Sequence, residues 1–161
     1  ADKISINTAA FTEPKFIGDA AAKFGSQCVV VSIDYRKRGD QSRAMIEGGK
    51  RDIGMDPREW ARIVEDRGAG EILLNSIDHD GMKNGYDLET LAGVVDAVKI
   101  PVIALGGVGK WDHFVDALKQ TRVDAVAAAN IFQYTDQSVY YAKQHLFEQQ
   151  LNVREPMLMS I

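Results

Sequence analysis

The chain has 161 residues, of which 45% are hydrophobic and 26% are charged, and its formal net charge is -4. This composition is typical of one globular domain with a core of its own, and the negative charge argues against nucleic acid as the main partner. No apolar run approaches the ~20 residues that a membrane span needs, so a membrane protein of the helical type is not expected.

Short apolar strands and amphipathic helices alternate along the chain. The predicted strands cover residues 3–6, 28–34, 71–77, 101–105 and 124–129, and they are rich in the β-branched residues of buried parallel sheets. The predicted helices cover residues 13–25, 56–68, 87–99, 110–120 and about 137–149, with a short helical turn near Ile131. Asp56 and Asp87 are good N-caps, and Pro57 suits a first helical position. Residues 35–55 are interpreted as a long polar loop.

About five alternations at this spacing predict a parallel sheet with right-handed crossovers and a single domain over residues 1–161. Two architectures remain open at this point, a doubly wound open sheet and a β/α barrel. A tripeptide echo, Ser32-Ile33-Asp34 and Ser76-Ile77-Asp78, suggests a duplicated βα unit. We expect each copy to end its strand in the same way.

Polar residues gather where the predicted strands end. Asn7, Asp34, Asp78, Asp80 and the pair 106–107 all fall at carboxyl ends, which meet at one edge of a parallel sheet in either architecture. Asp78 and Asp80 would project on the same side of an extended strand, and a carboxylate there could act as a general acid or base. Solvated turn residues are the alternative interpretation.

A second motif at that edge is the glycine-rich turn in "ALGGVGKW", residues 104–111, between a strand and a helix. Glycines let the backbone approach an anion, and a helix start offers unpaired N–H donors. The next strand ends in small residues and Asn130, which would complete a phosphate grip of the kind found after the last two strands of β/α barrels. Asn7-Thr8 could form a second anion site, and two such sites would suit a bisphosphate.

The sequences "ADKISINTAA", "GAGEILLNSIDHDGMKNGYD" and "IPVIALGGVGK" resemble HisF, the cyclase subunit of imidazole glycerol phosphate synthase, over essentially the whole chain. The resemblance implies a partial TIM-type β/α barrel of about five βα units, corresponding to strands four to eight of that family. It implies ammonia-dependent cyclase and lyase chemistry on a ribulosyl aminoimidazole carboxamide bisphosphate. It also implies a glutaminase partner of the HisH type and no cofactor. The single Cys28 excludes a disulfide framework, so we expect a cytoplasmic location, and one Cys with three scattered His gives no zinc-ligand spacing, so no metal is expected.

Matched motif by motif, the resemblance implies that Asp80 is the catalytic acid and that Asp34 is a supporting aspartate. Lys3 and Glu71 match a charged ring at the bottom of the barrel that gates ammonia entry. These roles are implied by the family pattern alone.

The same matching implies two phosphate-binding groups. Asn7 and Thr8 match residues that bind one phosphate. Gly81, Gly107 and Asn130 match the region that binds the other.

Two departures from the family pattern matter. The chain starts at the family's fourth strand, so the catalytic aspartate of strand one is absent and we expect a C-terminal piece that is inactive alone. Asn75, Leu105 and Met82 replace the expected Thr, Ser and Thr, which resembles HisF-like proteins of surface-polysaccharide clusters that deliver ammonia to a sugar precursor. A non-catalytic phosphate-binding half-barrel is a further alternative. An opened barrel would leave unpaired strand edges, so a homo-oligomer is expected.

Overall fold

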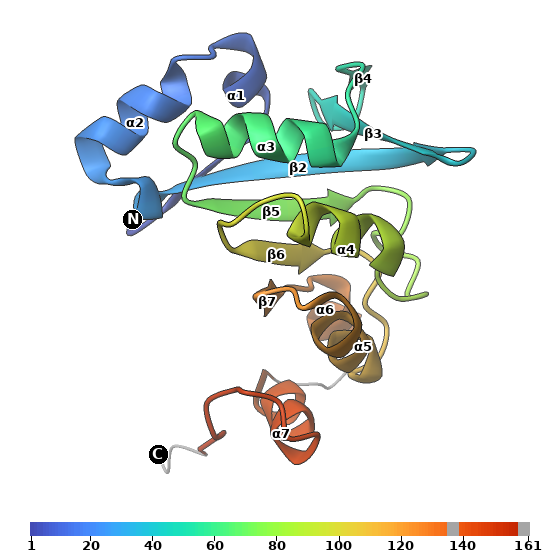
Figure 1. Cartoon of the computed structure of the whole chain (residues 1–161). Helices are drawn as coiled ribbons and strands as arrows, with labels where there is room; N and C mark the ends of the chain where they lie inside the picture. The colour runs from blue at the N-terminus through green and yellow to red at the C-terminus, as the bar shows by residue number, and fades with distance from the viewer. Residues whose placement is uncertain (135–138, 158–161) are drawn as a thin grey trace.

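The computed structural model describes residues 1–134 and 139–157. Helices and strands alternate around one seven-stranded sheet (Figure 1). The strands are β1 (Ile4–Ile6), β2 (Val29–Arg38), β3 (Gln41–Ile46), β4 (Arg51–Asp52), β5 (Glu71–Ser76), β6 (Val102–Leu105) and β7 (Ala125–Val126). The helices are α1 (Thr8–Thr12), α2 (Phe16–Phe24), the 3-10 turn η1 (Ser26–Cys28), α3 (Pro57–Asp66), α4 (Leu88–Val95), α5 (Asp112–Thr121), α6 (Asn130–Tyr134) and α7 (Val139–Glu148).

The parallel strands follow one another in chain order. β1 pairs with β2, β2 with β5, β5 with β6, and β6 with β7, all in parallel. A doubly wound sheet would reverse this order at a switch point, whereas a β/α barrel keeps it. The architecture is therefore mixed α/β and consistent with a partial TIM-type fold.

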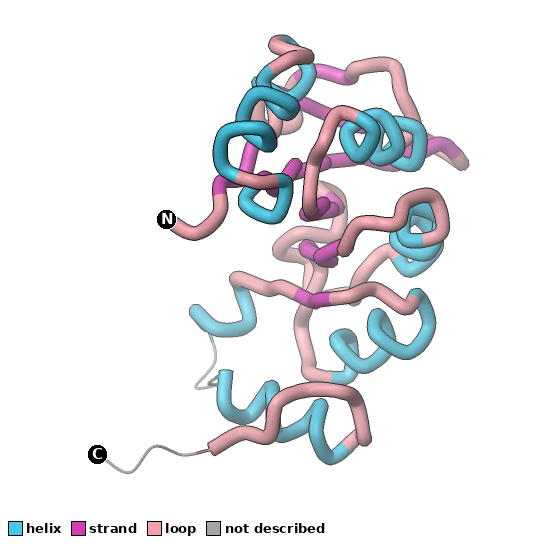
Figure 2. The backbone as a smooth tube through the Cα atoms, turned by 60° about the vertical axis from the view of Figure 1, so that its left-hand side comes forward, coloured by secondary structure: helices cyan, strands magenta, loops and turns pink. Residues whose placement is uncertain are grey.

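Helices cover one face of this sheet. Consecutive helices pack side by side, α3 against α4 and α4 against α5, and α2 and α3 pack on β2 while α4 packs on β6. The side chains that point to them are the most buried of the sheet: Val29, Val31, Ile33, Ile72 and Val102 are each at most 1% exposed. Figure 2 shows the strands in succession as an open stack, with α7 beyond the last of them. Within the described residues, β1 and β7 do not pair with each other.

The prediction that residues 35–55 form a long polar loop is wrong. β2 continues to Arg38 and turns through Gly39 and Asp40 into the antiparallel strand β3, which in turn pairs with β4. Gly39 has φ 61°, the conformation that a two-residue hairpin favours at its first turn position. We call residues 35–46 of this hairpin the arm; it starts at Tyr35, the last residue of β2 with a parallel partner. Its signal was the alternation after the turn, since Ser42, Ala44 and Ile46 are buried.

Smaller differences concern element ends. β7 is shorter than the predicted 124–129, because small alanines give little packing to a strand with one partner. Cys28 ends η1 instead of opening a strand. The helix α1 was not predicted. The last helix is described from Val139, and residues 137–138 of the prediction lie outside the described residues.

The tripeptide echo does not mark equivalent positions. Ser32 pairs with Leu73, and Ser76 pairs with Tyr35, so the two serines lie three residues out of register. Since side chains alternate between faces, an odd offset puts the two serines on opposite faces of the sheet. Ser76 is accordingly buried on the helix-covered face at 3% exposure, whereas Ser32 lies on the open face.

Candidate functional site

The carboxyl ends of the parallel strands lie at one edge, as the alternation predicted. We call this edge the mouth. It carries Asn7 after β1, the loop 77–87 after β5 (the Asp80 loop), and the turn 106–109 after β6 (the glycine turn). The parallel pairing of every one of these strands brings segments far apart in the sequence together.

Asp34 lies on the open face of β2, half-buried, where the strand leaves β1 and begins to pair with β3. Its Oδ1 accepts a hydrogen bond from Asn75 Nδ2 at 3.0 Å, from the register-paired position of β5. The other amide atom, Asn75 Oδ1, is buried and has no hydrogen-bond partner among the described residues. An unpaired buried acceptor costs about 1–3 kcal/mol, so this atom is a position where a ligand donor would be favourable.

The Asp80 loop does not continue the strand. β5 ends at Ser76, and the Asp80 N–H donates to the Ser76 carbonyl at 2.9 Å, which closes a turn. The prediction that Asp78 and Asp80 project together from an extended strand is therefore wrong. Asp78 Oδ2 accepts the backbone N–H of Lys37 at 2.8 Å, whereas Asp80 is exposed at the mouth. Asp78 thus supports the loop, and Asp80 remains available to a ligand.

The glycine turn interlocks with the end of the Asp80 loop. The Gly85 N–H donates to the Gly107 carbonyl at 2.8 Å, and the Gly85 carbonyl lies 2.8 Å from His79 Nδ1. Gly107 has φ 107°, and a Cβ there would lie 2.1 Å from the Gly85 oxygen, so no other residue can occupy this position without moving the loop. The N–H groups of Gly107 and Val108 donate no hydrogen bond within the described part of the chain.

Gly81 and Asn130 meet at the mouth. A Cβ built on Gly81, whose φ is 79°, would lie 3.2 Å from Asn130 Nδ2. Tyr86, from the same loop, donates its hydroxyl to the Ala127 carbonyl at 2.8 Å. The structure therefore places Gly81 near Asn130 and Gly107 near Gly85, and the phosphate grip stays a prediction.

The second predicted phosphate pair has its side chains engaged. Asn7 Nδ2 donates to the Ser32 carbonyl at 2.9 Å, and Thr8 Oγ1 donates to Asn7 Oδ1 at 3.2 Å and accepts the Glu47 N–H at 3.0 Å. Asn7 makes no side-chain capping bond to α1. These contacts connect β1 to β2 and to the residue after β3, so the side chains of this pair stabilise the fold.

Lys3 and Glu71 form a short ion pair at the amino ends of β1 and β5, the edge opposite the mouth. Their side chains are 47% and 19% exposed. The structure thus brings the two predicted gate residues into direct contact, far from the phosphate residues along the strand direction.

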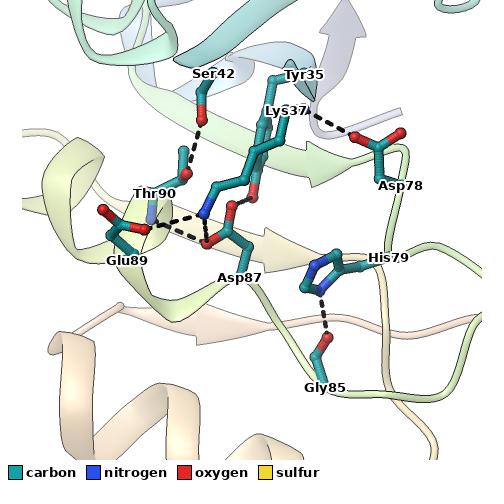
Figure 3. A network of polar contacts seen from close by, with 9 residues as sticks. All are labelled: Tyr35, Lys37, Ser42, Asp78, His79, Gly85, Asp87, Glu89 and Thr90. Atoms are coloured by element: carbon teal, nitrogen blue, oxygen red, sulfur yellow. Dashed lines mark hydrogen bonds and ion pairs between the residues drawn. The ribbon is translucent and has the colours of Figure 1, made fainter. Parts of the chain in front are cut away.

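Sequence reasoning treated Asp87 only as an N-cap and missed the network around it (Figure 3). Its carboxylate accepts the Thr90 N–H at 3.3 Å, the Tyr35 hydroxyl at 3.3 Å, and lies 3.2 Å from Lys37 Nζ. Burial alone would raise the pKa of Asp87, but the hydrogen bonds from Thr90 and Lys37 outweigh it and hold the pKa below its ordinary value. Tyr35 and Asp87 lie 52 positions apart and meet only in the folded chain, so no local sequence pattern indicated this cluster.

Three further groups near the mouth titrate away from their ordinary values. Burial raises the pKa of Tyr35, which the charge of Asp87 reinforces, and burial likewise raises the pKa of Tyr86. Burial, with nearby Lys110, lowers the pKa of His113. His113 Nδ1 accepts the Gly109 N–H at 3.1 Å, which requires this nitrogen to be unprotonated. The neutral imidazole therefore supports the glycine turn.

Within the described residues, no group of three or more His, Cys, Asp or Glu side chains could hold a metal ion. None of the described helices has the length and apolar character to cross a membrane.

Comparison with known proteins adds the family. The family described as "Histidine biosynthesis protein" matches residues 1–138. The imidazole glycerol phosphate synthase subunit HisF of Clostridium botulinum (strain Okra / Type B1) is 51% identical over 156 residues, a match that covers 96% of this chain and 62% of the relative. The chain thus spans less than two thirds of the length of that relative. From the matched residues and the identity together, the chain belongs to the histidine biosynthesis protein family, among the relatives of the HisF subunit.

Proposed function

We propose that this chain forms the carboxyl-terminal part of a HisF-type cyclase and supplies its acid residue and one phosphate grip. The observation that carries the proposal is the convergence at the mouth, where Gly81 of the Asp80 loop meets Asn130 and Gly85 meets Gly107. Asp80 is exposed on a loop that the Gly85–Gly107 hydrogen bond ties to the glycine turn, and a carboxylate near backbone N–H donors suits acid–base chemistry on a phosphorylated substrate.

Each group has a defined task in this proposal. The N–H groups of Gly107 and Val108 and the Asn130 amide bind one phosphate of a bisphosphate, and the region of Asn7 and Thr8 binds the other. Asp80 transfers a proton to or from the substrate during the cyclisation and elimination. Asp34 and Asn75 face the substrate from the open side of the sheet.

Ammonia would enter at the opposite edge, between Lys3 and Glu71, from a glutaminase of the HisH type. The ion pair would then have to open, because its two side chains contact each other directly in this structure. The sheet is open within the described residues, so we expect turnover only with complementary βα units that close it.

The decisive experiment supplies the first three βα units of a HisF relative as a separate polypeptide and measures cyclase turnover with ammonium. The mixture should turn over, and Asp80→Asn should reduce kcat by at least ~10²-fold, the usual scale for a lost general acid or base. The control Asp40→Asn removes an exposed carboxylate from the turn of the arm and should leave kcat unchanged. Full activity of Asp80→Asn, or turnover by the chain alone, would contradict the assignment.

The phosphate grip has a separate test. Substitution of Gly107 is uninformative, since any side chain there collides with Gly85. Asn130→Asp instead places a negative charge beside Gly81 and should abolish the thermal stabilisation that inorganic phosphate gives a folded state which binds it. Gln133→Glu makes the same charge change on the exposed side of α6 and should keep the stabilisation. No stabilisation of the unaltered chain at millimolar phosphate would remove the grip.

We also propose that the isolated chain forms a homo-oligomer through the open face. Unpaired strand edges promote pairing with another chain, and Leu73 and Ile103 on the open face keep part of their surface exposed. Sedimentation equilibrium at micromolar concentration should give a multiple of 17.8 kDa. A stable species at 17.8 kDa would exclude this assembly.

A second candidate is ammonia transfer to a sugar precursor, and the Asn75 carboxamide favours it. Its unpaired Oδ1 beside Asp34 would accept a hydroxyl or amine donor, groups in which a sugar is rich. The mixture of this chain with the separately supplied βα units, tested with ammonium and each substrate class in turn, would distinguish the two reactions. Phosphate binding without turnover of either class would instead indicate a non-catalytic phosphate-binding half-barrel.

A further inference from the structure

One residue of the arm, Lys37, contacts the Asp80 loop near both of its ends. At the start of the loop, the Lys37 backbone N–H donates to Asp78 Oδ2 at 2.8 Å. At its end, Lys37 Nζ lies 3.2 Å from Asp87 Oδ1 and 3.0 Å from Glu89 Oε2 (Figure 3). The backbone and the side chain of a single residue therefore contact both ends of the loop.

Neighbouring contacts reinforce the second of these anchors. The Tyr35 hydroxyl donates to Asp87 Oδ2 at 3.3 Å, and Ser42 Oγ lies 2.9 Å from Thr90 Oγ1, both of them buried pairs. The Asp87 side chain is 5% exposed and that of Lys37 is 37% exposed. A carboxylate so far removed from water is held more firmly by its partners than one of a surface ion pair.

Between the two anchors, residues 80–84 of the loop are all exposed. Backbone bonds from Asp80 to Ser76 and from Met82 to His79 shape the first half, and the Gly85 to Gly107 bond fixes the second half. Releasing either anchor would therefore return conformational freedom to this segment.

We propose that Lys37 is a positioning residue, which sets the place of Asp80 and Gly81 at the mouth by clamping both ends of their loop to the arm. Its bearing on catalysis rests on the proposed function, since a small misplacement of a reacting group can cost ~10²-fold in rate. The clamping itself does not depend on that function. It gives the arm, a hairpin that extends beyond the parallel sheet, a role at the mouth.

The two anchors can be released separately. Lys37→Met removes the ammonium and keeps the backbone N–H, so it frees the end of the loop and leaves the Asp78 bond. Asp78→Ala removes the acceptor at the start and keeps the Asp87 ion pair. Lys37→Arg retains a cation that can reach Asp87 and Glu89. Lys119→Met on α5 is the matched control, an exposed lysine far along the chain from the loop.

Amide hydrogen exchange, followed by NMR, reports each half of the loop. In Lys37→Met the Gly85 amide should exchange about fivefold faster, the factor that corresponds to a partly exposed ion pair of ~1 kcal/mol. In Asp78→Ala the Asp80 and Met82 amides should accelerate more than Gly85. Lys37→Arg should return the Gly85 rate toward that of the unaltered chain, and Lys119→Met should match it throughout.

A merely structural ion pair would lower the melting temperature without a local effect on these amides. Equal exchange of the loop in Lys37→Met and the unaltered chain would therefore overturn the proposal. If Lys37→Met does not fold, Asp78→Ala decides, because its side chain is exposed. Unchanged Asp80 and Met82 exchange in that variant overturns the proposal equally.

Inorganic phosphate separates this proposal from the proposed function. Where the unaltered chain binds phosphate, Lys37→Met should bind it several-fold more weakly, since Gly81 belongs to the grip. If Lys37→Met keeps the phosphate affinity of the unaltered chain but exchanges the Gly85 amide faster, Lys37 restrains the loop without positioning Gly81. If the unaltered chain binds no phosphate, the grip fails, and the exchange rates alone decide the role of Lys37.

Discussion

The two faces of the sheet differ in how completely they are covered. On the helix-covered face, Ile72 and Val31 have no exposed surface, whereas on the open face Leu73 and Ile103 keep part of theirs. Ile72 and Leu73 are neighbours in the same strand, so the difference comes only from what lies opposite each face. The fold is complete on one side and presents a partly apolar, partly polar surface on the other.

This difference separates the packing that the chain forms by itself from the contacts that require another polypeptide on the open face. The apolar core under the helices explains why a partial TIM-type arrangement can hold together. The open face carries Asp34 and Asn75 among apolar side chains. Such a surface suits the lining of a cavity better than contact with bulk water. Stability should therefore depend mainly on one face, and the proposed chemistry on the mouth and the other face.

The largest expected effect comes from shortening neighbouring side chains on opposite faces. Ile72→Ala should lower the free energy of unfolding by about 2–5 kcal/mol, the range for fully buried aliphatic residues. Leu73→Ala should cost roughly a third of that, because its side chain already meets solvent. Urea denaturation of both variants at one low protein concentration measures the difference.

Repeating that measurement at higher protein concentration sharpens the comparison. If a second copy covers the open face, the cost of Leu73→Ala rises with concentration while that of Ile72→Ala does not, because only the former would touch the partner. Equal costs for the two variants at every concentration would contradict the distinction between the faces.

An effect of intermediate size is expected at Asp87, whose side chain makes polar contacts. Asp87→Asn keeps an acceptor for the Thr90 N–H and loses the ion pair, so it should cost about 1–2 kcal/mol at pH 7 after allowing for the exposure of Lys37. The pKa of Asp87 is lowered in the fold, so its contribution is present above the ordinary carboxyl value of ~3.9 and is lost as pH falls through the folded pKa.

The stability difference between the unaltered chain and Asp87→Asn should accordingly shrink below about pH 4. Asp56→Asn is a useful comparison, because a hydrogen bond from Arg58 lowers the pKa of Asp56 on a different helix. An Asp87→Asn deficit that stays constant down to pH 3 would mean that the charge of Asp87 is not what stabilises the mouth.

The smallest effect concerns His113. Its pKa is lowered in the fold, so the unfolded chain binds the proton first and stability falls as pH drops below about 6.5. Protonation would break the Gly109 bond, with Lys110, Asp112 and Asp116 as the charges nearby. His113→Asn offers an acceptor that does not titrate, should change stability at pH 7 within about 0.5 kcal/mol, and should flatten the melting temperature between pH 5 and 7. An unchanged slope would assign that pH dependence elsewhere.

Sequence reasoning predicted the alternation and the common edge of the strand ends, because these follow from local rules. A β-branched run predicts a buried strand, Asp56 and Asp87 cap their helices as expected, and parallel strands must end at one edge. The catalytic, phosphate and gate roles came from the family pattern and stay predictions. The structure places Gly81 near Asn130 and Lys3 in contact with Glu71.

What the sequence by itself determined is thus the order of strands and helices and the residues at their ends. Tertiary structure alone decided that residues 35–46 form an arm, that the Ser-Ile-Asp repeats face opposite ways, and that Lys37 reaches both ends of the Asp80 loop. The physical reason is the distance along the sequence over which each interaction acts. Propensities and caps act over a few residues, whereas pairing register and ion pairs join positions such as Lys37 and Asp87 that meet only after the chain has folded.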